Sequence, residues 1–189
     1  MLIEKEKSRL IIIDVQEKLV SVMLKPHTFI DNIIRLQKAA NILGIKQTYS
    51  EQHPKGLGKT LDKIDENLYG KKLQTKFEYI EKTEFGIDGV MGGAKHYIIC
   101  GIEAHVCVLQ TAIKLAEIGP DYTQKARDEV RVYVVQDAVS SRYEKDYLTA
   151  LSRLNKYSNI EIVSCEMVLF EWLRKSGTER FKAISQLIK

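Results

Sequence analysis

Apolar residues gather in short runs that are separated by longer stretches with helical periodicity. Several runs are apolar at consecutive positions, which is typical of parallel strands covered on both faces. The predicted strands span residues 9–14, 46–51, 76–81, 95–100, 131–137 and 159–164. Because strands and helices alternate, the pattern predicts an α/β fold, a three-layer α/β/α sandwich around a mainly parallel six-stranded sheet.

The intervening segments show the periodicity of helices that pack on a sheet. The predicted helices span residues 29–43, 105–118, 144–157 and 165–188, the last broken near Gly177. Thr28 and Asp31 resemble a capping box, and Gly44 fits the end of the first helix. The helix over 105–118 is apolar on nearly all sides, so we expect it to be buried.

Two stretches lack periodicity and are interpreted as loops. Residues 53–72 contain glycine, proline and several lysines, and a loop of this length in a compact domain is often functional. Residues 119–130 begin with Gly-Pro and are polar, which indicates a surface insertion. Without a repeat, a low-complexity tract or a linker, residues 1–189 are expected to form a single domain.

Composition narrows the classes of function. Hydrophobic residues make up 44% and charged residues 29% of the chain, as in ordinary globular proteins. The net charge of +4 is spread along the chain, so nucleic-acid binding is not expected. No apolar run approaches the ~20 residues that span a bilayer, and the N-terminal segment does not resemble a signal peptide. Three cysteines favour a reducing compartment, so we expect a cytoplasmic protein, with mitochondrial association left open.

Two of the three cysteines lie in the stretch "CGIEAHVCVLQTA". The spacing of His96, Cys100, His105 and Cys107 matches no common zinc pattern. Cys100 and Cys165 are interpreted as small buried hydrophobes. Cys107 differs, because it is expected in the first turn of a helix, where unpaired N–H groups and the helix dipole favour a thiolate.

Asp14 and Lys82 follow two other predicted strands. The carboxyl ends of parallel strands share one edge of the sheet, so Asp14, Lys82 and Cys107 could meet there as carboxylate, ammonium and thiol. Asp14 and Lys82 also have common interpretations that involve no catalysis. An aspartate often ends an apolar strand without any chemistry, and an isolated lysine is usually a solvated surface residue.

The motifs themselves are more specific than their spacing. The stretches "RLIIIDVQEKL", "TYSEQHPKGLGKT", "YIEKTEFG", "GIEAHVCV", "DAVSSR" and "LFEWLRKSGTERFKAISQLIK" resemble, in order, the isochorismatase-like cysteine hydrolases over nearly the whole chain. The resemblance is closest to the small isochorismatase-domain branch, whose natural substrates are mostly undefined. It implies the isochorismatase-like hydrolase fold and a catalytic triad, which motif matching places at Asp14, Lys82 and Cys107.

The resemblance also implies a mechanism. The thiolate attacks a small amide or related C–N bond, forms a covalent thioester-type intermediate, and water completes the hydrolysis. A non-proline cis peptide, expected between Glu103 and Ala104, would aim N–H groups near Ala104 and Cys107 at the oxyanion. The implied partner is a small-molecule substrate, without a membrane, and relatives of this kind often form homo-oligomers.

The sequence departs from the metal-binding relatives after the second predicted strand. The segment "EQHPKGLGKT" contains His53 but no second histidine, so we expect neither a catalytic metal nor another cofactor. Gln16, Phe85, His105 and His53 are candidates for the substrate pocket. Core packing is an equal alternative for Gln16 and Phe85, and a solvated loop position is an equal alternative for His53.

Other functions remain as alternatives to hydrolysis. The chain could be a non-catalytic interaction protein that retains the fold, or a nuclease, since some relatives carry a ribonuclease label. No cluster of carboxylates for two metals and no histidine pair supports the nuclease. Residues 86–94 are glycine-rich and shorter than the corresponding segment of the family that the chain resembles, which leaves the wall of the substrate pocket undefined.

Overall fold

The computed structural model describes residues 1–64, 77–87, 94–118 and 130–188. Its strands are β1 (Ser8–Ile13), β2 (Lys46–Gln52), β3 (Phe77–Lys82), β4 (His96–Ile102), β5 (Arg131–Ser140) and β6 (Ile160–Val163). They form one sheet in the order β3-β2-β1-β4-β5-β6, and each neighbouring pair is parallel. The prediction of a six-stranded, mainly parallel sheet is therefore confirmed.

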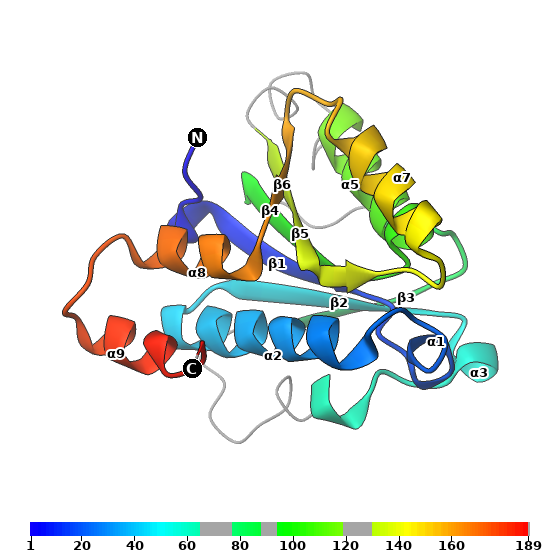
Figure 1. Cartoon of the computed structure of the whole chain (residues 1–189), viewed down its shortest axis with the longest axis horizontal. Helices are drawn as coiled ribbons and strands as arrows, with labels where there is room; N and C mark the ends of the chain where they lie inside the picture. Colours follow the sequence, from blue (N-terminus) through cyan, green and yellow to red (C-terminus); the bar gives the residue numbers. More distant parts are fainter. Residues whose placement is uncertain (65–76, 88–93, 119–129, 189) are drawn as a thin grey trace.

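Helices cover both faces of this sheet (Figure 1). On one face lie α2 (Pro26–Leu43), α8 (Cys165–Leu173) and α9 (Glu179–Ser185), and on the other lie α5 (Leu109–Ile118) and α7 (Glu144–Leu154). Short helices α1 (Glu17–Val20) and α3 (Pro54–Leu57) follow the carboxyl ends of β1 and β2. The arrangement confirms the predicted three-layer sandwich. None of the described helices combines the length and apolar character needed to cross a bilayer.

Strand β1 lies in the middle of the sheet and supplies both hydrophobic cores. Leu10 and Ile12 pack with the α2 side, while Ile11 and Ile13 pack with the α5 side. All four side chains are buried. Because successive side chains of a strand point to opposite faces, a centrally placed strand needs apolar residues at every position, which explains the unbroken run "LIII".

Helix α2 begins earlier than the sequence predicted. Its N-cap is Lys25, which has a positive φ of 43°, and Pro26 occupies the first helical position. The capping box at Thr28 and Asp31 is therefore wrong: proline already has the φ of a helix and has no N–H to satisfy, so it can open the helix without a side-chain cap. Gly44 ends the helix with a φ of 75°, as predicted.

The two segments interpreted as loops and the shortened segment 86–94 all extend outside the described residues. These parts are 65–72, 88–93 and 119–129. The shortened pocket wall and the surface insertion therefore stay predictions.

Gly101 sets the closest approach between β4 and β1. Its φ is 117°, a region that L side chains rarely adopt. A Cβ at this position would overlap the carbonyl oxygen of Ile13 and lie 2.6 Å from the Ile13 backbone nitrogen. The absence of a side chain thus allows β4 to pack against the backbone directly before Asp14.

We predict that Gly101→Ala destabilises the protein by roughly 2–5 kcal/mol, because backbone strain and overpacking add. Gly177→Ala is the matched control, since Gly177 also has a positive φ, 77°, but nothing lies within 4 Å of its would-be Cβ. The control should lose only about 1–2 kcal/mol. Urea unfolding followed by circular dichroism measures both losses, and equal losses would contradict the close-approach argument.

Candidate active site

Asp14 lies immediately beyond the end of β1, where the chain takes a positive φ of 51°. Its backbone N–H donates to the carbonyl of Ser50 at 3.1 Å. The side chain is completely buried, and the Ser50 hydroxyl donates to Asp14 Oδ1 at 2.7 Å. A carboxylate inside the protein needs such donors, because burial without them is strongly unfavourable. Strand β2 therefore fixes both the backbone and the carboxylate of Asp14 through Ser50.

Lys82 is the last residue of β3, and its ammonium reaches Asp14 Oδ2 at 2.6 Å. Only 4% of the Lys82 side chain is exposed, so its interpretation as a solvated surface residue is wrong. Gln52 Oε1 accepts a further hydrogen bond from Nζ at 2.8 Å. The carbonyl oxygens of Glu84 and Phe85 accept from the same nitrogen at 3.3 Å. Lys82 thus forms a buried, fully hydrogen-bonded ion pair with Asp14.

Cys107 lies in a π-helical turn, Ala104–Val108, between β4 and α5. Its side chain is buried, with 7% of the residue exposed. Burial, reinforced by the negative charge of Asp14, raises the pKa of the Cys107 thiol to about 12, while the positive charge of Lys82 lowers it. Both charges act on the sulfur, so the structure brings together the three residues that the sequence suggested.

The resting state of Cys107 differs from the sequence-based expectation. A position in the first helical turn was expected to favour the thiolate. Burial and the neighbouring carboxylate outweigh that effect and raise the pKa, so the thiol is protonated at neutral pH. A nucleophilic role for Cys107 therefore requires a base that removes the proton, and Asp14 is in position to act as one.

The other two cysteines have different surroundings. Cys100 and Cys165 are buried, and their thiols donate to the carbonyls of Ile11 and Asn32 at 3.5 Å and 3.6 Å. Burial raises the pKa of Cys100 well above its usual value and that of Cys165 to about 12. At Cys165 the Asp137 charge adds to this effect and the Arg35 charge opposes it, and both cysteines are free thiols, as Cys107 is. They have the environment of small buried hydrophobes.

The non-proline cis peptide lies between Ile102 and Glu103, so its prediction between Glu103 and Ala104 is wrong by one residue. Ile102 is still paired with Ser140 in the sheet, and the chain leaves the strand at the very next bond. The N–H groups of Val106 and Val108 both donate to the Glu103 carbonyl, at 3.0 Å and 3.2 Å. The turn toward Cys107 therefore starts as soon as strand pairing ends.

The Glu103 side chain connects the turn that carries Cys107 to the segment that follows β5. Its Oε2 accepts hydrogen bonds from the backbone N–H and from Nε of Arg142, both at 3.1 Å. Arg142 follows β5, the strand beside β4. Glu103 therefore supports the backbone on which Cys107 sits.

Gln16 is a predicted pocket residue whose side-chain amide bonds to the backbone at the end of β2 and in the segment that follows it. It is fully buried, and Nε2 donates to the carbonyls of Gln52 and Gly58 at 3.1 Å and 2.6 Å. Its Oε1 accepts from the backbone N–H of Gln52 at 2.8 Å. The amide thus holds the chain that follows β2. Phe85 is 53% exposed, so the alternative of core packing is wrong for this residue.

The two candidate histidines lie on separate elements, His105 in the π-helical turn Ala104–Val108 and His53 at the N-cap of α3. His105 Nδ1 is 3.0 Å from the Oγ of Ser141, and Ser141 directly precedes Arg142. His53 is exposed, and its backbone N–H donates to the Lys82 carbonyl at 3.1 Å. Within the described part of the chain, no group of three or more histidine, cysteine, aspartate or glutamate side chains could hold a metal ion. Metal independence itself stays a prediction.

Ser50 and Gln52 are the site residues that the sequence analysis missed. They occupy alternate positions at the carboxyl end of β2, and each places a polar group on one member of the Asp14–Lys82 pair. Alternate residues of a strand share a face. Two polar residues on one face, next to a strand that ends in aspartate, were the signal that could have revealed them.

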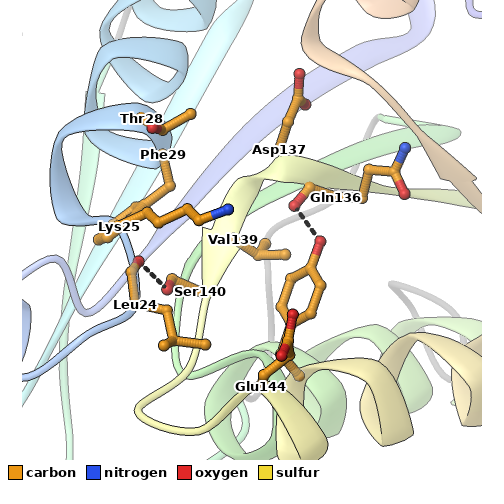
Figure 2. Close-up of a pocket in the computed structure, with 10 residues that line it drawn as sticks. Leu24, Lys25, Thr28, Phe29, Gln136, Asp137, Val139, Ser140 and Glu144 are labelled. Atoms are coloured by element: carbon orange, nitrogen blue, oxygen red, sulfur yellow. Dashed lines mark hydrogen bonds between the residues drawn. The ribbon is translucent and has the colours of Figure 1, made fainter.

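A cavity of about 330 Å³ opens elsewhere at the carboxyl edge, between the start of α2, the end of β5 and the start of α7. Figure 2 shows Phe29 and Val139 among its lining, with Lys25, Asp137 and Glu144 around them. The Ser140 hydroxyl donates to the Leu24 carbonyl at 2.8 Å and closes one wall. The lining includes none of Asp14, Lys82 and Cys107, so this cavity is distinct from the candidate active site.

Comparison with known proteins gives a consistent result. The model of the isochorismatase domain matches residues 8–166. The isochorismatase domain-containing protein 2 of Danio rerio is 36% identical over 183 residues, which cover 96% of this chain and 86% of the relative.

Solved structures agree with the sequence relatives. A structure described as the MAR1 ribonuclease of Caenorhabditis elegans is similar with a TM-score of 0.85 and 31% identity, covering 100% of this chain and 92% of that one. An octameric hydrolase of unknown specificity from Escherichia coli shares the fold, with a TM-score of 0.78 and 17% identity over 98% and 90% of the two chains.

We predict that alkylation of Cys107 by iodoacetamide accelerates steadily with pH and reaches no plateau below pH 10, because the thiol pKa is about 12. Lys82→Met should slow the reaction several-fold at every pH in this range, since the cation that lowers this pKa is lost. Lys156→Met, an exposed lysine on a distant turn, is the matched control and should leave the rate unchanged. Peptide mass spectrometry measures labelling at each cysteine.

A double variant extends the test of the same electrostatics to a protein in which neither buried charge is left without its partner. Asp14→Asn with Lys82→Met removes both the charge that raises the thiol pKa and the charge that lowers it. Cys107 should therefore react faster in the double variant than in Lys82→Met. Circular dichroism verifies folding, and identical Cys107 titrations in all folded variants would remove Lys82 from the site.

Proposed function

Because the chain belongs to the isochorismatase family, we propose that it is a cysteine hydrolase that cleaves a small amide or related C–N bond. The observation that carries the proposal is the buried Asp14–Lys82 ion pair, whose two charges both act on the Cys107 thiol. A strongly perturbed thiol beside a carboxylate and an ammonium is typical of an activated nucleophile.

The proposed reaction begins with a neutral thiol. As the Cys107 sulfur attacks the substrate carbonyl carbon, the Asp14 carboxylate accepts the thiol proton. The C–N bond then breaks, and the protonated Asp14 returns that proton to the departing amine. Lys82 opposes the rise of the thiol pKa and keeps the carboxylate oriented through its 2.6 Å contact.

Water completes the proposed cycle. Asp14 removes a proton from a water molecule, and the oxygen of that water attacks the thioester carbon. The C–S bond breaks, the carboxylic acid product leaves, and the sulfur recovers a proton from Asp14. The base is thus regenerated, and the chain supplies nucleophile and base without a metal or another cofactor.

The oxyanion of both tetrahedral intermediates needs donors, for which we propose the N–H groups of Ala104 and Cys107. Those of Val106 and Val108 already donate to the Glu103 carbonyl. Phe85, His105 and His53 are the proposed pocket residues, and because they lie on three different segments the substrate would contact several parts of the chain at once. Gln16 supports the pocket from within through its bonds to Gln52 and Gly58.

We further propose that the protein acts in the cytoplasm as a homo-oligomer. Its three cysteines are all free thiols, which suits a reducing compartment. Met167 and Phe170 of α8 are exposed large apolar side chains, which suit burial against a second copy. The similar Escherichia coli hydrolase is described as octameric, which supports assembly by this fold.

Ribonuclease activity is the second candidate, because the similar Caenorhabditis elegans structure carries the name MAR1 ribonuclease. The test compares RNA cleavage by the wild type and Cys107→Ala through successive purification steps. Constant specific activity that disappears in the variant would favour an RNA substrate. Activity that declines on purification and does not respond to Cys107→Ala would identify a contaminant.

We predict that one or more members of an amide library release ammonia or amine with the wild-type protein, and that Cys107→Ala lowers this activity by at least ~10³-fold because the nucleophile is lost. Cys100→Ala is the matched control, since it removes a buried thiol outside the site and should retain activity in the folded fraction. Equal activity of the two variants would reject Cys107 as the nucleophile. A wholly inactive wild type would favour the non-catalytic interaction protein.

We also predict that chelation leaves the hydrolysis rate unchanged within about twofold, because the proposed steps use only protein groups. The measurement is amide hydrolysis after treatment with a strong chelator and desalting, with metal analysis of the same sample. Loss of activity that returns when one stoichiometric metal is restored would overturn the metal-free mechanism.

A further inference from the structure

Ser50 lies near the carboxyl end of β2, beside the Asp14–Lys82 pair, and the proposed reaction gives it no step. Its hydroxyl donates to Asp14 Oδ1 at 2.7 Å, and only 1% of the residue is exposed. We propose that Ser50 is a positioning residue of this reaction, which acts through Asp14 and sets the lowest pH at which that carboxylate serves as the base. The inference rests on the proposed function and goes further by naming the residue that governs the base.

Ser50 contacts Asp14 at two points. Its carbonyl oxygen accepts a hydrogen bond from the Asp14 backbone N–H at 3.1 Å, while its hydroxyl binds the side chain. Asp14 has a positive φ of 51°, a conformation that L residues rarely adopt, so strand geometry ends at this residue. The hydroxyl therefore fixes where the carboxylate points once the strand has ended.

The two oxygens of the Asp14 carboxylate have different partners. Oδ2 accepts from the Lys82 ammonium at 2.6 Å, and Oδ1 accepts from Ser50. The ammonium is shared, because Gln52 Oε1 and two backbone carbonyls accept from the same nitrogen. The Ser50 side chain makes no second hydrogen bond to any described residue, so its O–H is committed to this one carboxylate.

Burial makes this hydroxyl important for the charge of Asp14. A hydrogen bond donated to a carboxylate favours its ionised form over its protonated form. Such a bond is stronger inside a protein than in water, and Asp14 is fully buried. The Asp14 carboxylate can accept the Cys107 proton only while it is ionised. Loss of the Ser50 hydroxyl should therefore let Asp14 become protonated, and inactive as a base, at higher pH.

Lys82 of β3 and Cys107 of the π-helical turn are the titratable residues that face Asp14 in the described structure. The raised pKa of Cys107, about 12, keeps its thiol protonated throughout the acid range, so it does not titrate together with Asp14. Both residues stay in place when Ser50 is replaced. A change on the acid side of the pH profile therefore reports on the Ser50 hydroxyl. A purely structural role would instead lower the rate by the same factor at every pH.

The pH dependence of kcat/KM for amide hydrolysis tests the proposal, because its acid limb reports the essential base of the free enzyme. Ser50→Ala should move this limb to higher pH by about one unit or more, the size expected from a hydrogen bond to a charged group. Ser50→Thr keeps the hydroxyl and should retain the wild-type limb. Thr48→Val is the matched control, because the fully buried hydroxyl of Thr48 lies on the same strand but accepts from Arg9, so its loss should leave the limb in place.

Carbon NMR of the Asp14 carboxyl measures the same charge without a substrate. In protein isotope-labelled at the aspartate carboxyl carbons, Asp14→Asn assigns the signal, and its titration midpoint should rise in Ser50→Ala by as much as the acid limb does. Ser50→Cys replaces the hydroxyl by a weaker donor and should shift the midpoint in the same direction by less, which keeps the test available where Ser50→Ala does not fold. If the wild type hydrolyses no amide, the proposed function fails, and the titration alone decides whether Ser50 governs Asp14.

Three outcomes would contradict the inference. An unchanged acid limb and an unchanged Asp14 titration in folded Ser50→Ala would show that the hydroxyl does not govern the base. Equal shifts in Ser50→Thr and Ser50→Ala would show that the hydroxyl is not the cause. A rate that falls by the same factor at every pH would leave Ser50 with a structural role alone.

Discussion

The buried ion pair between Asp14 and Lys82 is the interaction on which the rest of the site depends. Removing both charges from water is costly, and their attraction offsets that cost only when the remaining hydrogen-bonding groups are satisfied. Ser50 and Gln52 supply those bonds from β2. The pair therefore requires three neighbouring strands, β1, β2 and β3, to end in register at one edge of the sheet.

This requirement explains why the thiol is held neutral. A free ammonium beside Cys107 would favour the thiolate, but this ammonium is already paired with a carboxylate at 2.6 Å. The two charges of the pair act on the sulfur in opposite directions, and burial is the largest cause of the raised thiol pKa. The raised pKa keeps the proton on the Cys107 sulfur, and the Asp14 carboxylate lies next to it, so deprotonation can be coupled to attack on a substrate.

Much of this architecture could be predicted from local patterns. Apolar runs located the strands, because a central parallel strand must be apolar on both sides. The strand ends then made Asp14, Lys82 and Cys107 candidates, since parallel strands share one carboxyl edge, and the resemblance to family motifs selected them. The helix start at Pro26 was missed because a left-handed lysine cap leaves no side-chain signature. The thiol pKa was misjudged because burial depends on the whole packed structure, and Ser50 and Gln52 were missed because their partners lie on other strands.

The position of Lys82 in the sheet has a kinetic consequence. Among the strands that the structure describes, β3 is at the edge and is bonded to β2 alone, whereas β1 and β4, which lead to Asp14 and Cys107, lie in the interior. Edge elements open by local fluctuations that leave the centre of a sheet intact. Separation of this one strand would withdraw the ammonium while Asp14 and Cys107 kept their places, so the cluster of three residues would open more often than the protein unfolds.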